Sequence, residues 1–472
     1  MTSQTLTPGS GHGHAVVIGA SFAGLTAARA LAGFMDRVTV IERDWMPQGH
    51  ARRRGVRQAR YPHPLMPTAR QELERLFPGV GQDLERAGAM TVRMSDHLLL
   101  RGPDGWLPRC DTDLTLLSAG RDLIDAVLRE RLRSDPTVAF LPEHEVVGLE
   151  PGRQDTVTGV WVRGHDRGTP RAPGPRTLLS ADFVIDASGQ GSHAPQWLAE
   201  LGYGQVAETF RATQSPRAAA EFAPPVGHVA SWRSLQLMPS PGHPGEGMLH
   251  PVEGGRWSVS LTGGATGTPP TDHKELLRAA GALGHPLLHD VISTASPLGP
   301  VYHHPATGSR WRHYERLRRF PDQFLVVGDA LAALDPAHSQ GMTLAVRSAL
   351  TLNQLLTAHG TAIGLSRRLR QALAHQVASA WPPARPPRTP RARLRRWCAA
   401  RIDAHCATDP RAAELVLERL ATGGQTAQTL RPDVLRTALR APAVSLAAPE
   451  EATRRQARPV RTVQRQGEAA PS

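Results

Sequence analysis

A six-residue loop near the start of the chain constrains the fold more than any other segment; it reads Gly19-Ala20-Ser21-Phe22-Ala23-Gly24. It follows the apolar run 15–18, which predicts a buried strand, and leads into a predicted helix over 25–34. A second apolar run at 38–41 predicts the next strand, so the segment forms one βαβ unit. The spacing matches the dinucleotide fingerprint G-x-G-x-x-G, except that Ser21 replaces the second glycine.

The loop predicts an anion site, because backbone amides at a helix N-terminus bind phosphate oxygens. We expect this site to consist of Gly19, Ala20, Ser21 and Gly24. Glu42 and Arg43, at the end of the second strand, are further candidates for cofactor binding, and an acidic side chain at this place accepts hydrogen bonds from ribose hydroxyls. The unit alone does not distinguish FAD from NAD, and an ordinary βαβ unit with an unrelated loop is the alternative.

Composition excludes several classes of protein. The formal charge is +13 over 472 residues, but the arginines are scattered and no nucleic-acid motif accompanies them, so we expect no nucleic-acid partner. The three cysteines have neither CxxC spacing nor an even number, which favours a reducing, cytoplasmic location. The run 15–34 is rich in small residues and contains the predicted nucleotide loop, so we expect no membrane partner. We also expect no metal site. A monomer or a dimer is expected.

The order of apolar runs and turn residues along the chain predicts two domains and a helical region. After a flexible N-terminus (1–14), we expect the nucleotide-binding domain at 15–199 and 321–358, including a helix at 121–133, strands at 183–185 and 324–327, and a helix at 343–357. Residues 200–320, with parts of 90–115, predict an antiparallel substrate domain with a hairpin around Glu253-Gly254-Gly255. A helical region (359–445), interrupted by the proline-rich run 382–387, and a disordered tail (446–472) follow.

Three distant stretches resemble the FAD-dependent monooxygenase superfamily typified by p-hydroxybenzoate hydroxylase. The first stretch begins at 324–330 and continues through Asp335-Pro336 to 339–342. The second is 182–189, and the third is Gly120-Arg121. The resemblance implies that Asp329 binds the ribityl chain of FAD and that the amides of Gly341 and Met342 lie beside the flavin. It also implies that Arg121 reaches the pyrophosphate and that Asp186 belongs to the motif linked to flavin and pyridine nucleotide. Generic turns and solvated side chains are the alternatives.

Within that superfamily the segment 54–63 is similar to the flavin epoxidases of polyether antibiotic pathways, with Arg57 and Tyr61 replacing a proline and a histidine. Arg54 is therefore a further candidate for the cofactor site. The likeness extends through 72–79 and 254–257. It implies an α/β fold: a Rossmann-type, p-hydroxybenzoate hydroxylase-like FAD-binding domain, an inserted antiparallel β-sheet substrate domain and a C-terminal helical region.

The activity implied by the resemblance is oxygen insertion. FAD, reduced by NADH or NADPH, would use O2 to oxygenate an alkene or an aromatic ring of a small secondary metabolite of polyketide type, as in antibiotic biosynthesis. No catalytic base is evident from spacing: His63, His250, His303 and His304 are candidates, but structural or solvated roles are favoured for each. Epoxidation, which needs no base, is therefore favoured over hydroxylation.

The same motifs are compatible with three other functions. A flavin halogenase is disfavoured because the Trp-x-Trp-x-Ile-Pro segment is absent and the nearest stretch, 231–234, lacks the pattern. An FAD-dependent dehydrogenase or reductase would keep the same FAD motifs. A non-enzymatic flavin-binding protein is the third alternative, because a fold does not determine a function.

Overall fold

The computed structural model describes residues 13–53, 57–164, 174–212, 216–240, 242–262, 268–304, 308–335, 340–361, 363–381, 389–423 and 431–440. The candidate Arg54, the side chains of Arg57 and His304, and Pro336 and Ser339 of the motif lie outside the described residues. So do residues 1–12 of the expected flexible N-terminus and the expected disordered tail 446–472.

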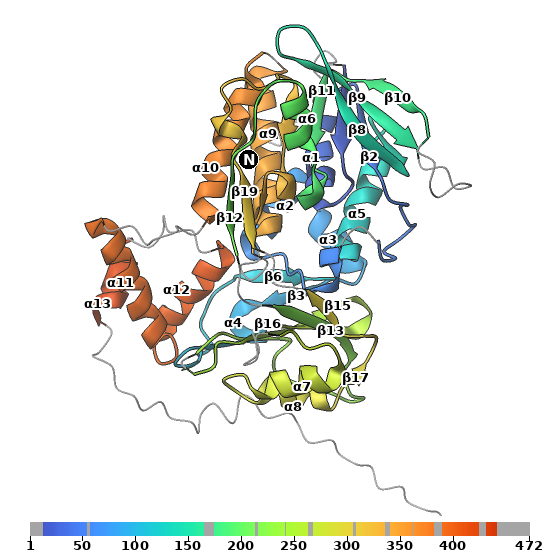
Figure 1. Cartoon of the computed structure of the whole chain (residues 1–472). Coiled ribbons are helices and arrows are strands. Elements are labelled where there is room, and N and C mark those ends of the chain that lie inside the picture. The colour runs from blue at the N-terminus through green and yellow to red at the C-terminus, as the bar shows by residue number, and fades with distance from the viewer. Residues whose placement is uncertain are drawn as a thin grey trace, which may run out of the picture.

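A five-stranded parallel sheet forms the centre of the upper half of the molecule (Figure 1). Its order is β20 (Phe324–Val326), β11 (Phe183–Asp186), β1 (His14–Ile18), β2 (Arg37–Glu42) and β7 (Val138–Pro142). Strand β1 is buried along its whole length, which explains its continuous apolar run, since both faces of such a sheet are covered.

Helices and a second sheet cover the parallel sheet. Helix α1 (Phe22–Ala32) packs against α5 (Arg121–Arg133) and α9 (Gly341–His359), and α9 packs against α2 (Pro67–Leu76) and α10 (Leu365–Ala380). The antiparallel strands β8 (His144–Pro151), β9 (Val157–Gly164) and β10 (Arg176–Ser180) form the second sheet, in which β8 contacts β2 and β9 contacts β11. The helix predicted at 121–133 is confirmed, whereas α1 begins three residues before the predicted Leu25.

His14 is part of strand β1 and not of a flexible lead-in, which corrects the expectation for this residue. Its backbone N–H donates to Asp182 (2.8 Å), and its ring nitrogens bond the Ser180 carbonyl (2.7 Å) and the Thr39 hydroxyl (2.8 Å). These contacts bury the imidazole and extend the strand by one residue.

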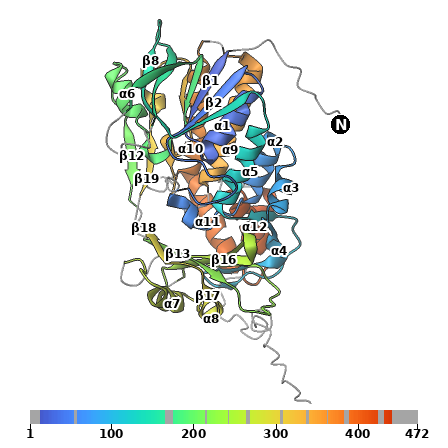
Figure 2. The ribbon, with the colours of Figure 1, turned by 90° about the vertical axis from the view of Figure 1, so that its right-hand side faces the viewer.

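The lower half of the molecule contains an eight-stranded, mainly antiparallel sheet (Figures 1 and 2). Its strands are β17 (Ser296–Pro297), β13 (Arg217–Ala223), β16 (Arg256–Thr262), β15 (Glu246–Val252), β14 (Ser234–Leu237), β4 (Leu98–Gly102) and β5 (Gly105–Trp106), with β18 (Tyr302–His304) on β13. The predicted hairpin is confirmed: Gly254 and Gly255 have φ of 72° and 68°, the left-handed backbone that a tight hairpin needs. Helices α7 (His273–Gly281) and α8 (Leu287–Ser293) cover one face.

The chain crosses between the two halves at places that differ from the predicted boundaries. Strands β12 (Glu208–Arg211) and β19 (Ser309–Arg312) pair with each other and, through β19, with β21 (Ala332–Ala333), in a sheet of their own. Tyr314 belongs to the core of the parallel sheet, and Trp311 and Phe320 pack against that core. Tyr314 is buried there and the other two side chains are partly buried, so the segment 309–320 packs with the parallel sheet and not with the eight-stranded sheet.

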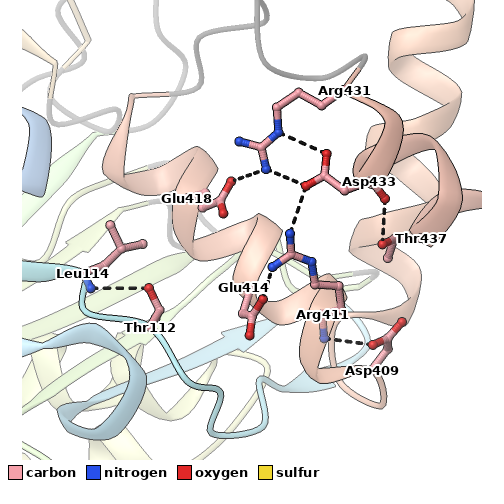
Figure 3. A network of polar contacts seen from close by, with 9 residues as sticks. All are labelled: Thr112, Leu114, Asp409, Arg411, Glu414, Glu418, Arg431, Asp433 and Thr437. Atoms are coloured by element: carbon pink, nitrogen blue, oxygen red, sulfur yellow. Dashed lines mark hydrogen bonds and ion pairs between the residues drawn. The ribbon is translucent and has the colours of Figure 1, made fainter.

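The C-terminal helices α11 (Pro390–His405), α12 (Pro410–Ala421) and α13 (Pro432–Arg440) form a third core with β3 (Met90–Arg93), β4 and β6 (Thr115–Ser118). A polar network joins α12 to the first turn of α13: Arg411 and Arg431 both pair with Asp433, and Arg431 also pairs with Glu418 (Figure 3). Within the part of the chain that the structure describes, none of the helices combines the length and the apolar character required to cross a membrane.

Candidate functional site

The loop between β1 and α1 has the close contacts that its glycines predict. Gly19 has a φ of 100°, and a Cβ there would lie 2.7 Å from the Ala187 carbonyl oxygen. A Cβ at Gly24 would lie 1.8 Å from the Gly19 oxygen. Only glycine fits at these two positions, so the loop turns tightly and the first turn of α1 packs on the strand ends.

Glu42 points from the end of β2 back to this loop. Its carboxylate accepts hydrogen bonds from the backbone amides of Ala20 (2.9 Å) and Asp44 (3.0 Å). Arg53 pairs with the same carboxylate at 2.5 Å and donates to the Ala20 carbonyl at 2.7 Å. Both side chains are buried, so the ion pair ties the loop to the second strand.

Arg53 is a residue that the sequence analysis missed. The sequence feature that could have indicated Arg53 is the run Arg52-Arg53-Arg54, of which only Arg54 was a candidate. Arg43, the candidate next to Glu42, has an exposed side chain. The structure therefore makes Arg53, and not Arg43, the arginine that contacts Glu42.

Arg121 reaches the loop from the first residue of α5. Its Nη2 donates to the Ser21 hydroxyl at 3.0 Å and its Nε to Asp125 at 2.8 Å. The Ser21 hydroxyl in turn donates to Asp125 at 3.3 Å. The structure thus places Arg121 beside the predicted anion site, with its charge at the loop and next to the N-terminus of α1.

Asp186 ends strand β11 and is fully buried. One carboxylate oxygen accepts from the amide (2.9 Å) and the hydroxyl (2.5 Å) of Ser188, and the other accepts from the Ser192 hydroxyl (2.5 Å). Burial raises the pKa of this carboxyl above its ordinary value, although these bonds lower it. Asp186 therefore stabilises the turn after β11, and its contact with a cofactor stays a prediction.

Asp329 follows β20 in a short turn that packs on the nucleotide loop. A Cβ at Gly328, whose φ is 61°, would lie 2.5 Å from the Cβ of Ala23 on α1. The Asp329 carboxylate accepts from Gln190 at 3.4 Å. The ends of β1, β2, β11 and β20 thus bring Gly19, Glu42, Asp186 and Asp329 to one edge of the parallel sheet, where α/β folds bind ligands.

Helix α9 begins at Gly341 near the same edge, in contact with the turn that carries Asp329. A Cβ at Gly341 would meet nothing within 4 Å, whereas Met342 is buried. Gln340, the N-cap residue, makes no side-chain cap and donates instead to the Gly423 carbonyl at the end of α12. Among the described residues, none caps the N-terminus of this long helix with its side chain, and the helix begins next to a contact with the C-terminal helical region.

Of the candidate histidines whose side chains the structure describes, two have a lowered pKa and one is exposed. His63 bonds the Tyr61 carbonyl at 2.6 Å, and burial together with Arg121 lowers its pKa to about 4. His250 bonds the Ser234 hydroxyl at 3.1 Å, and burial lowers its pKa to about 4. His303 is exposed. Structural roles therefore suit His63 and His250 better than proton transfer at neutral pH.

The chain is similar to proteins of known sequence and of known structure. No protein-family model matches the chain. Protein Rv3254 of Mycobacterium tuberculosis (strain ATCC 25618 / H37Rv) is 32% identical over 374 residues, covering 78% of each chain. PqsL, a probable FAD-dependent monooxygenase from Pseudomonas aeruginosa, is 16% identical with a TM-score of 0.55, covering 86% of this chain and 100% of its own. The flavin-dependent brominase Bmp2 is 14% identical with a TM-score of 0.59, covering 90% of this chain and 97% of its own.

These comparisons confirm the predicted fold class, including the Rossmann-type domain and the C-terminal helical region. The likeness to the polyether-pathway epoxidases stays a prediction. The chain belongs to the same family as Protein Rv3254 of M. tuberculosis, and its fold is that of FAD-dependent monooxygenases and flavin-dependent halogenases.

Proposed function

We propose that the chain binds FAD along the edge formed by the ends of β1, β2, β11 and β20 and acts as a monooxygenase. It inserts one oxygen atom of O2 into an alkene or an aromatic ring of a small, polyketide-type molecule, with NADH or NADPH as the electron donor. The observation that carries the proposal is the convergence of four separate segments on this edge: the 19–24 loop, Glu42, Arg121 and Asp329.

The residues at the edge fit the parts of FAD. The loop amides from Ser21 onward and Arg121 suit the pyrophosphate, because both present positive charge or N–H donors to an anion, whereas the amides of Gly19 and Ala20 already donate to the Ile41 carbonyl and to Glu42. Among the residues that the structure describes, one oxygen of Glu42 accepts only the Asp44 amide, so it has capacity for a ribose hydroxyl. Asp329 suits the ribityl hydroxyls, and the first amides of α9, at Gly341 and Met342, suit the electron-rich side of the flavin ring.

When bound, FAD supplies the oxygen activation, and the protein supplies position, electrostatics and exclusion of water. In this chain the N-terminus of α9 favours negative charge, and the eight-stranded sheet lies below the half of the molecule that contains the parallel sheet (Figure 1). The turn after β20 and the start of α9 join these two parts, because Asp335 lies between them and pairs with Arg217 on the sheet.

The test begins with FAD. Purified protein incubated with excess FAD and freed of unbound flavin is expected to retain flavin absorbance, with micromolar or tighter affinity. Protein that retains none overturns the proposal at its first step.

The second step supplies the FAD-loaded protein with NADH or NADPH, ¹⁸O-labelled dioxygen and candidate polyene or aromatic polyketides. One labelled oxygen in the product, located by mass spectrometry, supports monooxygenation, and its position separates an epoxide from a phenol. Product formed equally well without oxygen indicates a dehydrogenase or reductase. Bound FAD without NAD(P)H oxidation under any condition indicates a non-enzymatic flavin-binding protein.

A further inference from the structure

The eight-stranded sheet has one apolar face and one face, called the polar face, on which polar side chains lie among Ala219, Met248 and Val252. Side chains alternate along its central strands, and the apolar set packs against α7 and α8. The other face is turned toward the rest of the molecule (Figure 1), and it carries Arg217, Glu221, Ser234, Gln236, Glu246, His250, Ser258, Ser260 and Thr262. The serines, Thr262 and His250 are buried, although a buried polar group is costly unless it has a partner.

This polar face meets the nucleotide-binding domain at its charged residues. Glu221 pairs with Arg52, which also pairs with Asp122 on the first turn of α5. Arg217 pairs with Asp335 at 3.3 Å, in the segment between the Gly328-Asp329 turn and α9. The polar face is therefore the wall of the sheet nearest to the proposed flavin site.

Arg217, Thr262 and Glu246 lie in one row across three neighbouring strands, because Thr262 is the register partner of both other residues. Gln236, on the next strand, donates to Glu246 at 3.2 Å. Arg217 pairs with Asp335 at 3.3 Å, and its charge also acts on Glu246 and on Tyr61, which come from two other segments of the chain.

The environment of Glu246 suits a group that exchanges a proton. Burial is the largest effect on its carboxyl and raises its pKa above the ordinary value. Arg217 and the Gln236 hydrogen bond act in the opposite direction, and Asp335 adds to the rise. Burial also raises the pKa of Tyr61, which interacts electrostatically with Arg217, to about 12, so its hydroxyl is neutral at pH 7.5.

We propose that this row is the polar end of the substrate site and that Glu246 takes the hydroxyl proton of a phenolic substrate. The inference rests on the proposed function and selects the aromatic-ring reaction within it. In the step, the phenol O–H bond breaks, an O–H bond forms on the Glu246 carboxylate, and the electron pair stays on the substrate oxygen. Arg217 stabilises the resulting phenolate, which is the more electron-rich form of the ring.

The test measures preference for a free hydroxyl. FAD-loaded full-length protein is titrated with 1-naphthol and 1,8-dihydroxyanthraquinone, and in parallel with their O-methyl ethers, by calorimetry and by absorbance of the bound aromatic compound. Wild-type protein is expected to bind at least one phenol about tenfold or more tightly than its ether, which corresponds to one charge-assisted hydrogen bond. The bound phenol is also expected to show phenolate absorbance at pH 7.5.

Glu246→Gln keeps the shape of the side chain and removes its ability to take a proton, so both the preference and the phenolate signal are expected to disappear. The matched control is Glu145→Gln, the same exchange on β8 in the separate three-stranded sheet. This control is expected to keep both signals, and equal melting temperatures and FAD content of the two variants show that folding is unchanged.

Three results overturn the role of Glu246: no phenol of the set binds, the ethers bind as tightly as the phenols, or Glu246→Gln retains the preference. An FAD-loaded protein with any of these results leaves the flavin proposal standing. A protein that takes up no FAD overturns the proposed function as well.

Discussion

The Arg121 guanidinium donates a 3.0 Å hydrogen bond to the Ser21 hydroxyl, although 100 residues separate them in the chain. Ser21 occupies the position at which the dinucleotide fingerprint has its second glycine. The serine does not obstruct the loop, since its hydroxyl turns toward Arg121 and Asp125. The departure from the fingerprint is therefore accommodated by α5, an element that the fingerprint does not include.

Substitution of Gly24 by alanine is expected to lower the free energy of unfolding by about 1–3 kcal/mol, as overpacking does. The added Cβ would lie 1.8 Å from the Gly19 oxygen, so the loop must shift, and FAD retention should fall with it. Gly33→Ala, at the other end of the same helix, is the control, because a Cβ there meets nothing within 4 Å. Urea denaturation of both variants measures the difference, and equal stability would contradict the close packing.

Removal of Arg53 is expected to destabilise the protein because it leaves the buried Glu42 carboxylate without its cation. Breaking a buried ion pair on one side costs about 3–5 kcal/mol. Arg53→Met should show this loss, whereas Arg43→Met, at an exposed side chain ten positions earlier, should stay within about 0.5 kcal/mol. The double variant Glu42→Gln/Arg53→Met should recover part of the loss, and strict additivity of the two single changes would contradict the coupling.

Asp329→Ala is expected to weaken FAD binding by roughly tenfold or more, the cost of one charge-assisted hydrogen bond. Arg43→Ala should change the affinity less, since its side chain points to solvent. Titration of the apoprotein with FAD, followed by quenching of flavin fluorescence, gives both dissociation constants. Equal and negligible effects would show that the turn after β20 does not contact the ribityl chain.

Stability is expected to fall as the pH falls from 6.5 toward 4, and His250 is one cause. Burial lowers its pKa from 6.5 to about 4, so in this window the unfolded chain binds a proton that the folded chain does not. At pH 5 this amounts to about 2 kcal/mol relative to pH 7.5. His250→Asn should make the dependence of the unfolding free energy on pH shallower. His375→Asn, the same exchange at an exposed position on α10, is the matched control, and an effect as large as that of His250→Asn would contradict the role of burial.

The sequence by itself predicted the half of the molecule that contains the parallel sheet. The glycine spacing of 19–24 and the acidic residue after the second strand are local patterns, and each requires a particular backbone shape or a particular strand end, whereas the Gly-Asp turn at 328–329 was predicted from the family resemblance. The helix at 121–133 and the hairpin at 253–255 were likewise predicted from local periodicity and from turn glycines.

Only the tertiary structure decided which polar side chains meet. Arg53 rather than Arg43 or Arg54 became the partner of Glu42, because the path of the chain after β2 returns residue 53 to the loop. Glu246, Arg217 and Asp335 lie far apart in the sequence, and they converge because strand register and the return of the chain at β21 bring them together. Such contacts depend on pairing between distant strands, about which a single sequence holds no local signal.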